Sequence, residues 1–567
     1  MSKYLHLFKT ATGFNTAYSG EGYAEPWVSY ILENERVKYN KSEYEVLLET
    51  PLTFEVTGDG DIIWKAVDTG YTRTIEYRKN EGEWTGIDST TAGTVINVAS
   101  GDTVEFRGDN ATYTPTSSKY NYFSGTTAEF KLKGNIMSLI KSTGFSTLDS
   151  IYSAYTYDIF NRLFLGCTGL TDASNLLLPA TTLAGTCYYG MFSGCTGLVA
   201  APELPAATLA GSCYSQMFEG CTSLITAPEL PATTLATYCY EAMFRNCTSL
   251  TATPKLPATT LTSKCYSQMF EGCTSLTQAP ELPATELPYF SYNRMFAGCT
   301  GLTSAPALPA TTLGQSCYGY MFYGCTSLTA APELPATTLA TYCYTWMFCG
   351  CTDLTTPPEL PATALTEGCY ECMFYGCTNL TTAPELAATV LAKLCYHWMF
   401  YNCLNITVPP VLPATTLAEQ CYKGMFHNCR KLAQLPTLPA TALTVGCYDT
   451  MFNGCTGLTE IPNNYLPLTT LAASCYTGMF WFCNNITSTP ELPAATLAPC
   501  CYQNMFQSCG KLATIVCLAT DISATNCTTD WVKQVASSGT FTKAASMTGW
   551  TSGANGIPSN WTIQNAS

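Results

Sequence analysis

One motif recurs through most of this chain and constrains its fold more than any other feature. It reads Cys-Tyr-x-x-Met-Phe-x-Gly-Cys-Thr-x-Leu, and its thirteen copies are spaced by 26 residues, except for one step of 28 before the twelfth. The methionines of the copies are Met191, Met217, Met243, Met269, Met295, Met321, Met347, Met373, Met399, Met425, Met451, Met479 and Met505. A fixed period of roughly 20 to 50 residues is typical of solenoids, propellers and other arrays. The sequence therefore predicts stacked repeats, which allow a chain of 567 residues to grow without separate globular cores.

Within one copy, the apolar residues are spaced like one face of a short helix. In the sixth copy they are Cys317, Tyr318, Met321, Phe322 and Cys325. Spacings of three, four and eight residues fall on one face of an α-helix. A helix this short is not stable alone. We therefore predict that these residues and their equivalents form core ladders between stacked copies, while the variable residues between them point outward.

The other half of each copy, Leu-Thr-x-Ala-Pro-Glu-Leu-Pro-Ala-Thr-Thr-Leu, favours a short strand. Proline cannot donate a hydrogen bond to a β-ladder, so the strand is confined to about residues 328–331. Equivalent strands of stacked copies would pair in parallel. The predicted fold class is an α/β solenoid, with a parallel β-ladder and short helical turns.

Degenerate copies are predicted to cap both ends of the array. Ile159, Phe160, Leu163 and Phe164 occupy the Cys-Tyr and Met-Phe places 28 residues before the first full copy. Cys527 and Trp531 lie one step of 26 after the last Cys and Met, with the other positions irregular, as in capping repeats.

Before the repeats, residues 46–136 alternate between apolar and polar side chains. Short runs such as Leu52-Thr-Phe-Glu-Val and Thr103-Val-Glu-Phe-Arg are separated by Gly-, Asn- and Asp-rich turns, and no helical period intervenes. This pattern predicts an all-β, immunoglobulin-like sandwich. The predicted domains are a lead-in or docking segment at 1–45, the sandwich at 46–136, the capped solenoid at 137–530, with its full copies at about 170–510, and a C-terminal cap at 531–567.

All 31 cysteines fall from Cys167 onward, two per copy in most copies. Free cysteine behaves as a small buried hydrophobe, so two ladders of buried thiols are the main interpretation, and some disulfides are the alternative. Cys369-Tyr-Glu-Cys372 has the spacing of a redox motif and Cys500-Cys501 are adjacent, but Cys369 and Cys501 are ladder positions, so both patterns follow from the repeat. The spacing gathers no four-ligand zinc group, and no metal or cofactor is expected.

The repeat resembles a known family. Met-Phe-x-Gly-Cys-Thr-Ser-Leu-Thr is similar to the Ala-Phe-x-x-Cys-x-x-Leu landmark of BspA-type leucine-rich repeats, with Met in place of Ala, an added Ala-Pro-Glu-Leu-Pro and a longer period. Such repeats are common in surface proteins of gut Bacteroidales. The Lys3–Lys41 lead-in, the strand-rich module ending in Gly134-Asn-Ile-Met-Ser-Leu and the Trp550–Trp561 tail resemble tail- or capsid-associated proteins of the crAss-like phages that infect those bacteria.

Outward-pointing aromatic residues gather in copies six to ten and are the candidate binding site. They are Tyr320, Tyr323, Trp346, Tyr375, Trp398, Tyr401 and His427, with His397 beside them. Exposed aromatic patches often bind sugars or proteins. A host-surface glycan or protein receptor is the functional interpretation; contact with another copy of the chain, or incidental variation, are the alternatives.

A row of carboxylates also follows the repeat, at Glu203, Glu229, Glu281, Glu333, Glu359, Glu385 and Glu491. Carboxylates on neighbouring copies are potential calcium ligands. A solvated face explains them more simply, because the Asp/Asn/Gly-rich loop of a calcium site is missing.

The remaining features point away from catalysis, nucleic acid and membrane insertion. The chain has three histidines and a net charge of −15, and it contains no phosphate-binding Gly loop and no run of 18 apolar residues. Its N-terminus lacks the apolar run of a secretory signal. We predict a non-enzymatic phage virion protein: a tail fibre, receptor-binding protein or capsid decoration. Its N-terminal region would attach to other virion proteins. A bacterial cell-surface adhesin is the alternative.

Overall fold

The computed structural model describes residues 6–10, 13–17, 41–110, 119–151 and 158–566. It divides into two compact units, Met1–Ala258 and Thr259–Ser567. Most of the lead-in predicted at 1–45 lies outside the described residues. Its described parts are strands β1 (His6–Thr10) and β2 (Gly13–Ala17), which pair antiparallel, and the start of helix α1 (Lys41–Glu49).

The rest of the N-terminal region is built from two sheets. The six-stranded sheet has the order β11-β10-β3-β8-β5-β6, and the three-stranded sheet has the order β7-β4-β9. The strands are β3 (Leu52–Gly58), β4 (Gly60–Ala66), β5 (Thr74–Lys79), β6 (Thr85–Asp88), β7 (Thr94–Val98), β8 (Thr103–Arg107), β9 (Asn121–Phe123), β10 (Glu129–Asn135) and β11 (Leu170–Leu177). In β8, Val104 and Phe106 are fully buried between half-buried neighbours, the period of two of a strand with one face in a core. The predicted all-β character is present in the described strands; the immunoglobulin-like topology stays a prediction.

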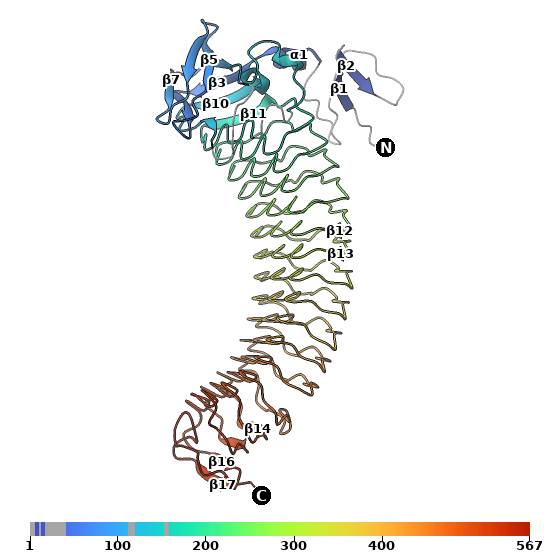
Figure 1. The fold of residues 1–567 in the computed structure, drawn as a ribbon, viewed down its shortest axis with the longest axis vertical. Coiled ribbons are helices and arrows are strands. Elements are labelled where there is room, and N and C mark those ends of the chain that lie inside the picture. The colour runs from blue at the N-terminus through green and yellow to red at the C-terminus, as the bar shows by residue number, and fades with distance from the viewer. Residues whose placement is uncertain (1–5, 11–12, 18–40, 111–118, 152–157, 567) are drawn as a thin grey trace. The chain divides into compact units, whose positions relative to one another are not determined.

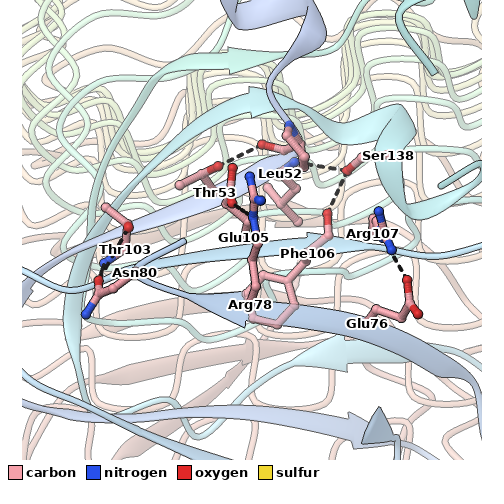
Figure 2. A network of polar contacts seen from close by, with 11 residues as sticks. Leu52, Thr53, Glu76, Arg78, Asn80, Thr103, Glu105, Phe106, Arg107 and Ser138 are labelled. Atoms are coloured by element: carbon pink, nitrogen blue, oxygen red, sulfur yellow. Dashed lines mark hydrogen bonds and ion pairs between the residues drawn. The ribbon is translucent and has the colours of Figure 1, made fainter. Parts of the chain in front are cut away.

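Paired charges cover the outer face of the larger sheet. Arg78 of β5 bonds Glu105 of β8, and Arg107 of β8 donates to Glu76 of β5 at 2.7 Å, as Figure 2 shows. Both guanidinium groups also lie over the ring of Trp84, at 4.9 and 4.0 Å from its centroid. Because each charge has a partner on the neighbouring strand, this network is explained by sheet stability.

Two short 3-10 helices, η1 (Ile136–Leu139) and η2 (Phe145–Thr147), follow β10. The hydroxyl of Ser138 in η1 accepts from the Leu52 N–H of β3 at 2.9 Å and donates to the Phe106 carbonyl of β8 at 2.9 Å (Figure 2). One buried side chain thus joins η1 to two strands of the sheet.

The larger sheet runs directly into the first turns of the solenoid. Strand β10 pairs antiparallel with β3 on one side and parallel with β11 on the other, and β11 lies within the repeat region. Phe164 of the N-terminal cap lies 5.8 Å, between ring centroids, from Phe123, and the Cys167 thiol donates to the Phe123 carbonyl at 2.8 Å. The sandwich and the first repeats therefore share one core within the first unit.

The prediction of helical turns in the repeat is wrong. The Cys-Tyr-x-x-Met-Phe stretches are drawn in Figure 1 without coiled segments, and in the sixth copy they form successive hydrogen-bonded turns. The N–H groups of Met321 and Tyr323 bond to carbonyls three residues back. Those of Tyr318 and Phe322 bond instead to Cys343 and Met347 of the next copy, at 3.1 and 2.9 Å.

Two features of the backbone explain why turns replace the helix. Residues in the left-handed conformation recur every four positions, as at Ser316 (φ 51°), Tyr320 (φ 57°) and Gly324 (φ 71°), and each ends a turn. Alternate N–H groups are then free to bond to the next copy, which an α-helix does not allow. Over nine residues, a period of four places nearly the same side chains inward as a period of 3.6. Cys317, Tyr318, Met321, Phe322 and Cys325 are accordingly all buried.

The remainder of each copy pairs in parallel with its neighbours, mostly through single bridges. Thr338, Ala364 and Val390 form one such row in the second unit, and Ala330 bridges Thr356 in another. In the row of Thr338, β12 (Glu286–Leu287) and β13 (Thr312–Leu313) pair in parallel over two residues each. The predicted parallel pairing is therefore present. The strand predicted at 328–331 is reduced to the single bridge at Ala330, because the nearby prolines cannot donate to a β-ladder.

A four-stranded parallel sheet forms at the end of the chain. Its strands, each pairing with the next, are β14 (Ser488–Leu492), β15 (Thr514–Cys517), β16 (Thr540–Lys543) and β17 (Thr562–Asn565). The indole of Trp531 stacks between Tyr502, at 6.2 Å, and Trp550, at 5.6 Å, between ring centroids. The C-terminal residues thus extend the array and cover its last aromatic column.

Stacked copies place identical side chains above one another in the core. Phe322 lies 5.6 Å from Phe348 and Tyr318 lies 5.7 Å from Tyr344, between ring centroids, with planes within 6° of parallel. The second cysteine of a copy donates its thiol to the backbone of the preceding copy, as from Cys325 to the Phe296 carbonyl at 3.1 Å. All 31 cysteines are free thiols, and all but Cys500 are buried.

Candidate functional site

Two outward columns of the second unit carry the predicted aromatic residues. One column contains Tyr320, Trp346 and Trp398, which all have positive φ angles of 52–57°. The other column contains Tyr323, Tyr375, Tyr401 and His427. We call these seven residues the aromatic strip. The sixth copy contributes a ring to both columns, as does the ninth, while the seventh, eighth and tenth copies contribute one ring each.

The rings of the aromatic strip form one continuous run of contacts. Measured between ring centroids, Tyr320 lies 5.8 Å from Trp346, which lies 5.4 Å from Tyr375. Tyr375 lies 4.4 Å from Tyr401, and Tyr401 lies 4.4 Å from His427. The structure therefore brings together residues separated by more than one hundred positions in the sequence.

Stacking along the strip covers most ring faces. The planes of Tyr375 and Tyr401 are within 2° of parallel, and those of Tyr320 and Trp346 within 4°. Only Tyr323, 39% exposed, is an exposed residue, and the other six are half-buried. The strip consequently offers ring edges and hydroxyl groups along its length, and it offers full ring faces mainly where a column ends.

Arginine, glutamate and histidine side chains hold two of the rings in place. The guanidinium of Arg294 lies 5.1 Å from the Tyr320 ring centroid and pairs with Glu271 at 3.1 Å. His397 stacks on Trp398 with 4.5 Å between centroids, and its Nδ1 lies 2.9 Å from Glu371 Oε1. Sequence reasoning missed Arg294; its position in the Tyr320 column is the signal that identifies it.

The strip is fixed in an uncharged state near neutral pH. Burial, with a smaller effect of Tyr401, raises the pKa of Tyr375 to about 12. Burial lowers the pKa of His427 to about 4. Both rings are therefore neutral at pH 7 and suited to uncharged hydrogen-bonding and stacking partners.

Two cysteines occupy strip columns where a ring is missing. Cys349 follows Tyr323 in its column, and Cys372 stands between Trp346 and Trp398 in the other. Both are buried, at 5% and 0% exposure, and burial is the largest cause that raises the pKa of each thiol. They fill space beneath the rings as neutral thiols, so the Cys369-Tyr-Glu-Cys372 spacing follows from the fold.

The carboxylate row of the sequence does not gather into a metal site. Its members in the second unit, such as Glu281, Glu333 and Glu359, are exposed. In the described part of the chain, no group of three or more His, Cys, Asp or Glu side chains is close enough to hold a metal ion. Among the same residues, no helix is both long and apolar enough to cross a bilayer.

A cleft of about 600 Å³ lies at the end of the strip that His427 occupies. It is lined by His427, Asn428, Arg430, Asn453, Gly454, Thr456, Trp481, Phe482 and Asn484. Apart from His427, none of these residues was singled out in the sequence. The sequence feature that could have pointed to the cleft is Phe482, because eight of the thirteen copies have glycine at this position and three have asparagine.

Comparison with known proteins identifies the repeats. A family described as "BspA type Leucine rich repeat region (6 copies)" matches residues 159–303, 211–355, 292–424, 347–487 and 419–527, which together cover more than half of the chain. No curated protein matches the chain significantly, and no solved structure does.

Proposed function

We propose, because this chain belongs to the BspA-type leucine rich repeat family, that it is a non-enzymatic binding protein whose solenoid attaches to a cell surface through the aromatic strip. The observation that carries the proposal is the continuous run of rings from Tyr320 to His427. Copies outside the strip have Gly190, Gln216 or Ala242 at the column position of Tyr320. The repeat thus folds without aromatic residues there.

The residue type at this column position is what distinguishes the strip. Trp346 and Trp398 have left-handed backbones, but so do Gln216 (φ 58°) and Ala242 (φ 52°) in copies without a ring, so the conformation belongs to the turn of the repeat. Aromatic residues are also the most frequent binding hot spots at protein surfaces.

The finer proposal places the protein on a phage particle. The resemblance of its N-terminal module and C-terminal tail to proteins of crAss-like phages supports a tail fibre, receptor-binding or capsid-decorating role. The N-terminal region would contact other virion proteins, and the strip would contact a glycan or protein of the host surface. Immunodetection in purified virions is expected; detection only in bacterial envelopes would replace this proposal with a cell-surface adhesin.

The binding role is tested with a double variant, Trp346→Ala and Trp398→Ala. Binding of the purified full chain to host cells is expected to fall at least tenfold, because two central rings of the strip are removed. Asn504→Ala is the matched control, since Asn504 has the same column position and a φ of 56° outside the strip. A folded double variant that binds cells like the wild type would refute the strip as the binding surface; recovery of the chain as a stable dimer through the strip would favour a subunit contact.

A further inference from the structure

The cleft beyond His427 is a regular grid of three columns on three successive copies. The tenth copy contributes His427, Asn428 and Arg430, the eleventh Asn453, Gly454 and Thr456, and the twelfth Trp481, Phe482 and Asn484. In the central column, the middle copy has Gly454, which lacks a side chain, between Asn428 and Phe482. The eleventh copy therefore forms the floor of the cleft, and its neighbours form the walls.

The size of the cleft matches a single ring-shaped ligand. Adjacent copies are spaced by about 4.8 Å, so the two walls stand roughly 10 Å apart. Contact of a ligand with each wall takes about 3.5–4.0 Å between carbon atoms. The remaining space accepts one six-membered ring between the side chains of the tenth and twelfth copies.

Phe482 has a backbone conformation that is unfavourable for a bulky side chain. Its φ is 60°, and its side chain is 46% exposed. Glycine adopts this backbone without strain, and eight copies have glycine here. Phe482 also stacks on Trp481, with 5.2 Å between centroids and 12° between planes. Phe482 is therefore an exposed aromatic residue, supported by the half-buried Trp481, at a position where most copies have glycine, which indicates a surface for ligand contact.

Polar groups in the cleft are suited to hydroxyl and carboxylate partners. Arg430 donates from Nε to the Asn428 side-chain oxygen at 2.8 Å, which orients the guanidinium and leaves its two terminal nitrogens for a ligand. Arg430 is the one charged residue in the lining, and no carboxylate is present there. The amides of Asn453 and Asn484 add donors and acceptors, and the Thr456 hydroxyl, which donates to the Arg430 carbonyl at 3.4 Å, adds an acceptor. The buried indole N–H of Trp481 has no hydrogen-bond partner in the described residues.

We propose that this cleft binds one pyranose residue of a surface glycan, with a carboxylate on the sugar facing Arg430. The C–H face of the sugar packs on the aromatic pair of the twelfth copy, and its hydroxyl groups bond to the amides. This inference deepens the proposed function and rests on it, because it names the ligand class where the aromatic strip ends. A sugar acid is favoured over a neutral hexose, since the single unpaired charge of the lining is positive.

Phe482→Gly tests the proposal with little risk of misfolding. Glycine relieves the left-handed backbone, so the variant is expected to fold at least as well as the wild type. Ser508→Gly is the matched control: Ser508 has the same column position on the next copy, a φ of 61°, and no place in the cleft. Both variants receive the same backbone relief, and only one loses a ring.

The probes are immobilised oligosaccharides of hexuronic acids and of neutral hexoses, with the full chain in solution. The wild type is expected to prefer the hexuronic acids, Phe482→Gly to weaken that binding about tenfold, and Ser508→Gly to leave it unchanged. Arg430→Gln should remove the preference for the acidic sugars. Binding to neither panel, or equal binding by Phe482→Gly and the wild type, would overturn the proposal.

The two proposals fail separately. If cells lose binding on Trp346→Ala/Trp398→Ala but no oligosaccharide is bound, the strip binds another class of receptor and the cleft proposal is wrong. If hexuronic acid binding depends on Phe482 while the tryptophan variant binds cells normally, the cleft stands and the strip proposal is wrong.

Discussion

Alanine at position 424 is expected to move an indole of the aromatic strip. Gly424 has a φ of 57°, and a Cβ atom there would lie 2.3 Å from Cδ1 and 2.5 Å from Nε1 of Trp398. Gly446, 22 residues further along the chain, has a φ of 60°, but its added Cβ would meet the flexible Gln420 side chain at 3.2 Å and Asp449 Cβ at an ordinary contact distance of 4.0 Å. The two substitutions therefore share a backbone penalty and differ in the clash.

The difference in stability follows from these contacts. The left-handed backbone costs alanine roughly 1–2 kcal/mol at either position. Ordinary contact between carbon atoms is about 3.5–4.0 Å, so the Trp398 indole must move by more than about 1 Å, and overpacking of this kind costs about 1–3 kcal/mol. We expect a loss of about 1–2 kcal/mol for Gly446→Ala and about 2–5 kcal/mol for Gly424→Ala.

Urea unfolding followed by circular dichroism measures both losses, and a double variant isolates the clash. In the Trp398→Ala background the indole is gone, so Gly424→Ala should cost no more than Gly446→Ala does. The coupling free energy between positions 398 and 424 is then about 1–3 kcal/mol. Tryptophan fluorescence should change in Gly424→Ala, because the Trp398 indole moves out of contact with Tyr401.

Two results would refute this reasoning. One is an equal loss of stability for both glycine variants. The other is a Gly424→Ala penalty that stays the same when Trp398 is removed. Either would mean that the indole does not pack against Gly424, and that the end of the strip is arranged differently.

The remaining predictions concern the thiols and the acid response. In native protein near pH 7, a thiol reagent should react promptly with the half-buried Cys500 alone among the 31 cysteines, and in denaturant without reductant it should find all 31; a much lower count would reveal disulfides. Burial raises the pKa of Cys349 to about 12, so moderate alkali should not speed its reaction in the folded state. Because His427 has a pKa of about 4 when folded and 6.5 as its ordinary value, the unfolded state binds more protons between these limits. Its contribution to stability is thus present above about pH 6.5 and is lost as the pH falls towards 4. In His427→Gln, the urea concentration at the unfolding midpoint should vary less with pH over that range. An unchanged pH profile would contradict the lowered pKa of His427.

The repeat in the sequence was sufficient to predict an array with parallel pairing and free thiols, but not its local backbone. Residues at spacings of three, four and eight satisfy both a helix and successive turns, so Tyr318, Met321 and Phe322 are buried in either case. Whether the stretch forms a helix or successive turns depends on whether alternate N–H groups bond to carbonyls of the next copy, as the Phe322 N–H does to the Met347 carbonyl. That partner is 25 residues away, and no local propensity encodes it. The signal that favoured turns was the glycine or asparagine that stands at the position of Gly324 in eleven of the thirteen copies.

For the candidate site, outward aromatic residues were recognisable from their place in the repeat, because every copy shares the same inward positions. Their mutual contacts were not, since the stacking of Tyr375 on Tyr401 depends on how closely adjacent copies approach. The cleft required the structure as well, because residues of three successive copies line it, with Gly454 between Asn428 and Phe482.

By itself, then, the sequence determined the period, the buried ladders and the columns in which variable residues stand. A strict repeat makes each copy's apolar face complementary to the next, and stacking is the way to bury it. Only the tertiary structure decided that each rung is a series of turns, that β10 joins the N-terminal sheet to the first repeats, and that rings in two columns form a continuous strip ending in a cleft. These features arise from hydrogen bonds and contacts between copies, and such contacts appear only once the copies are packed together.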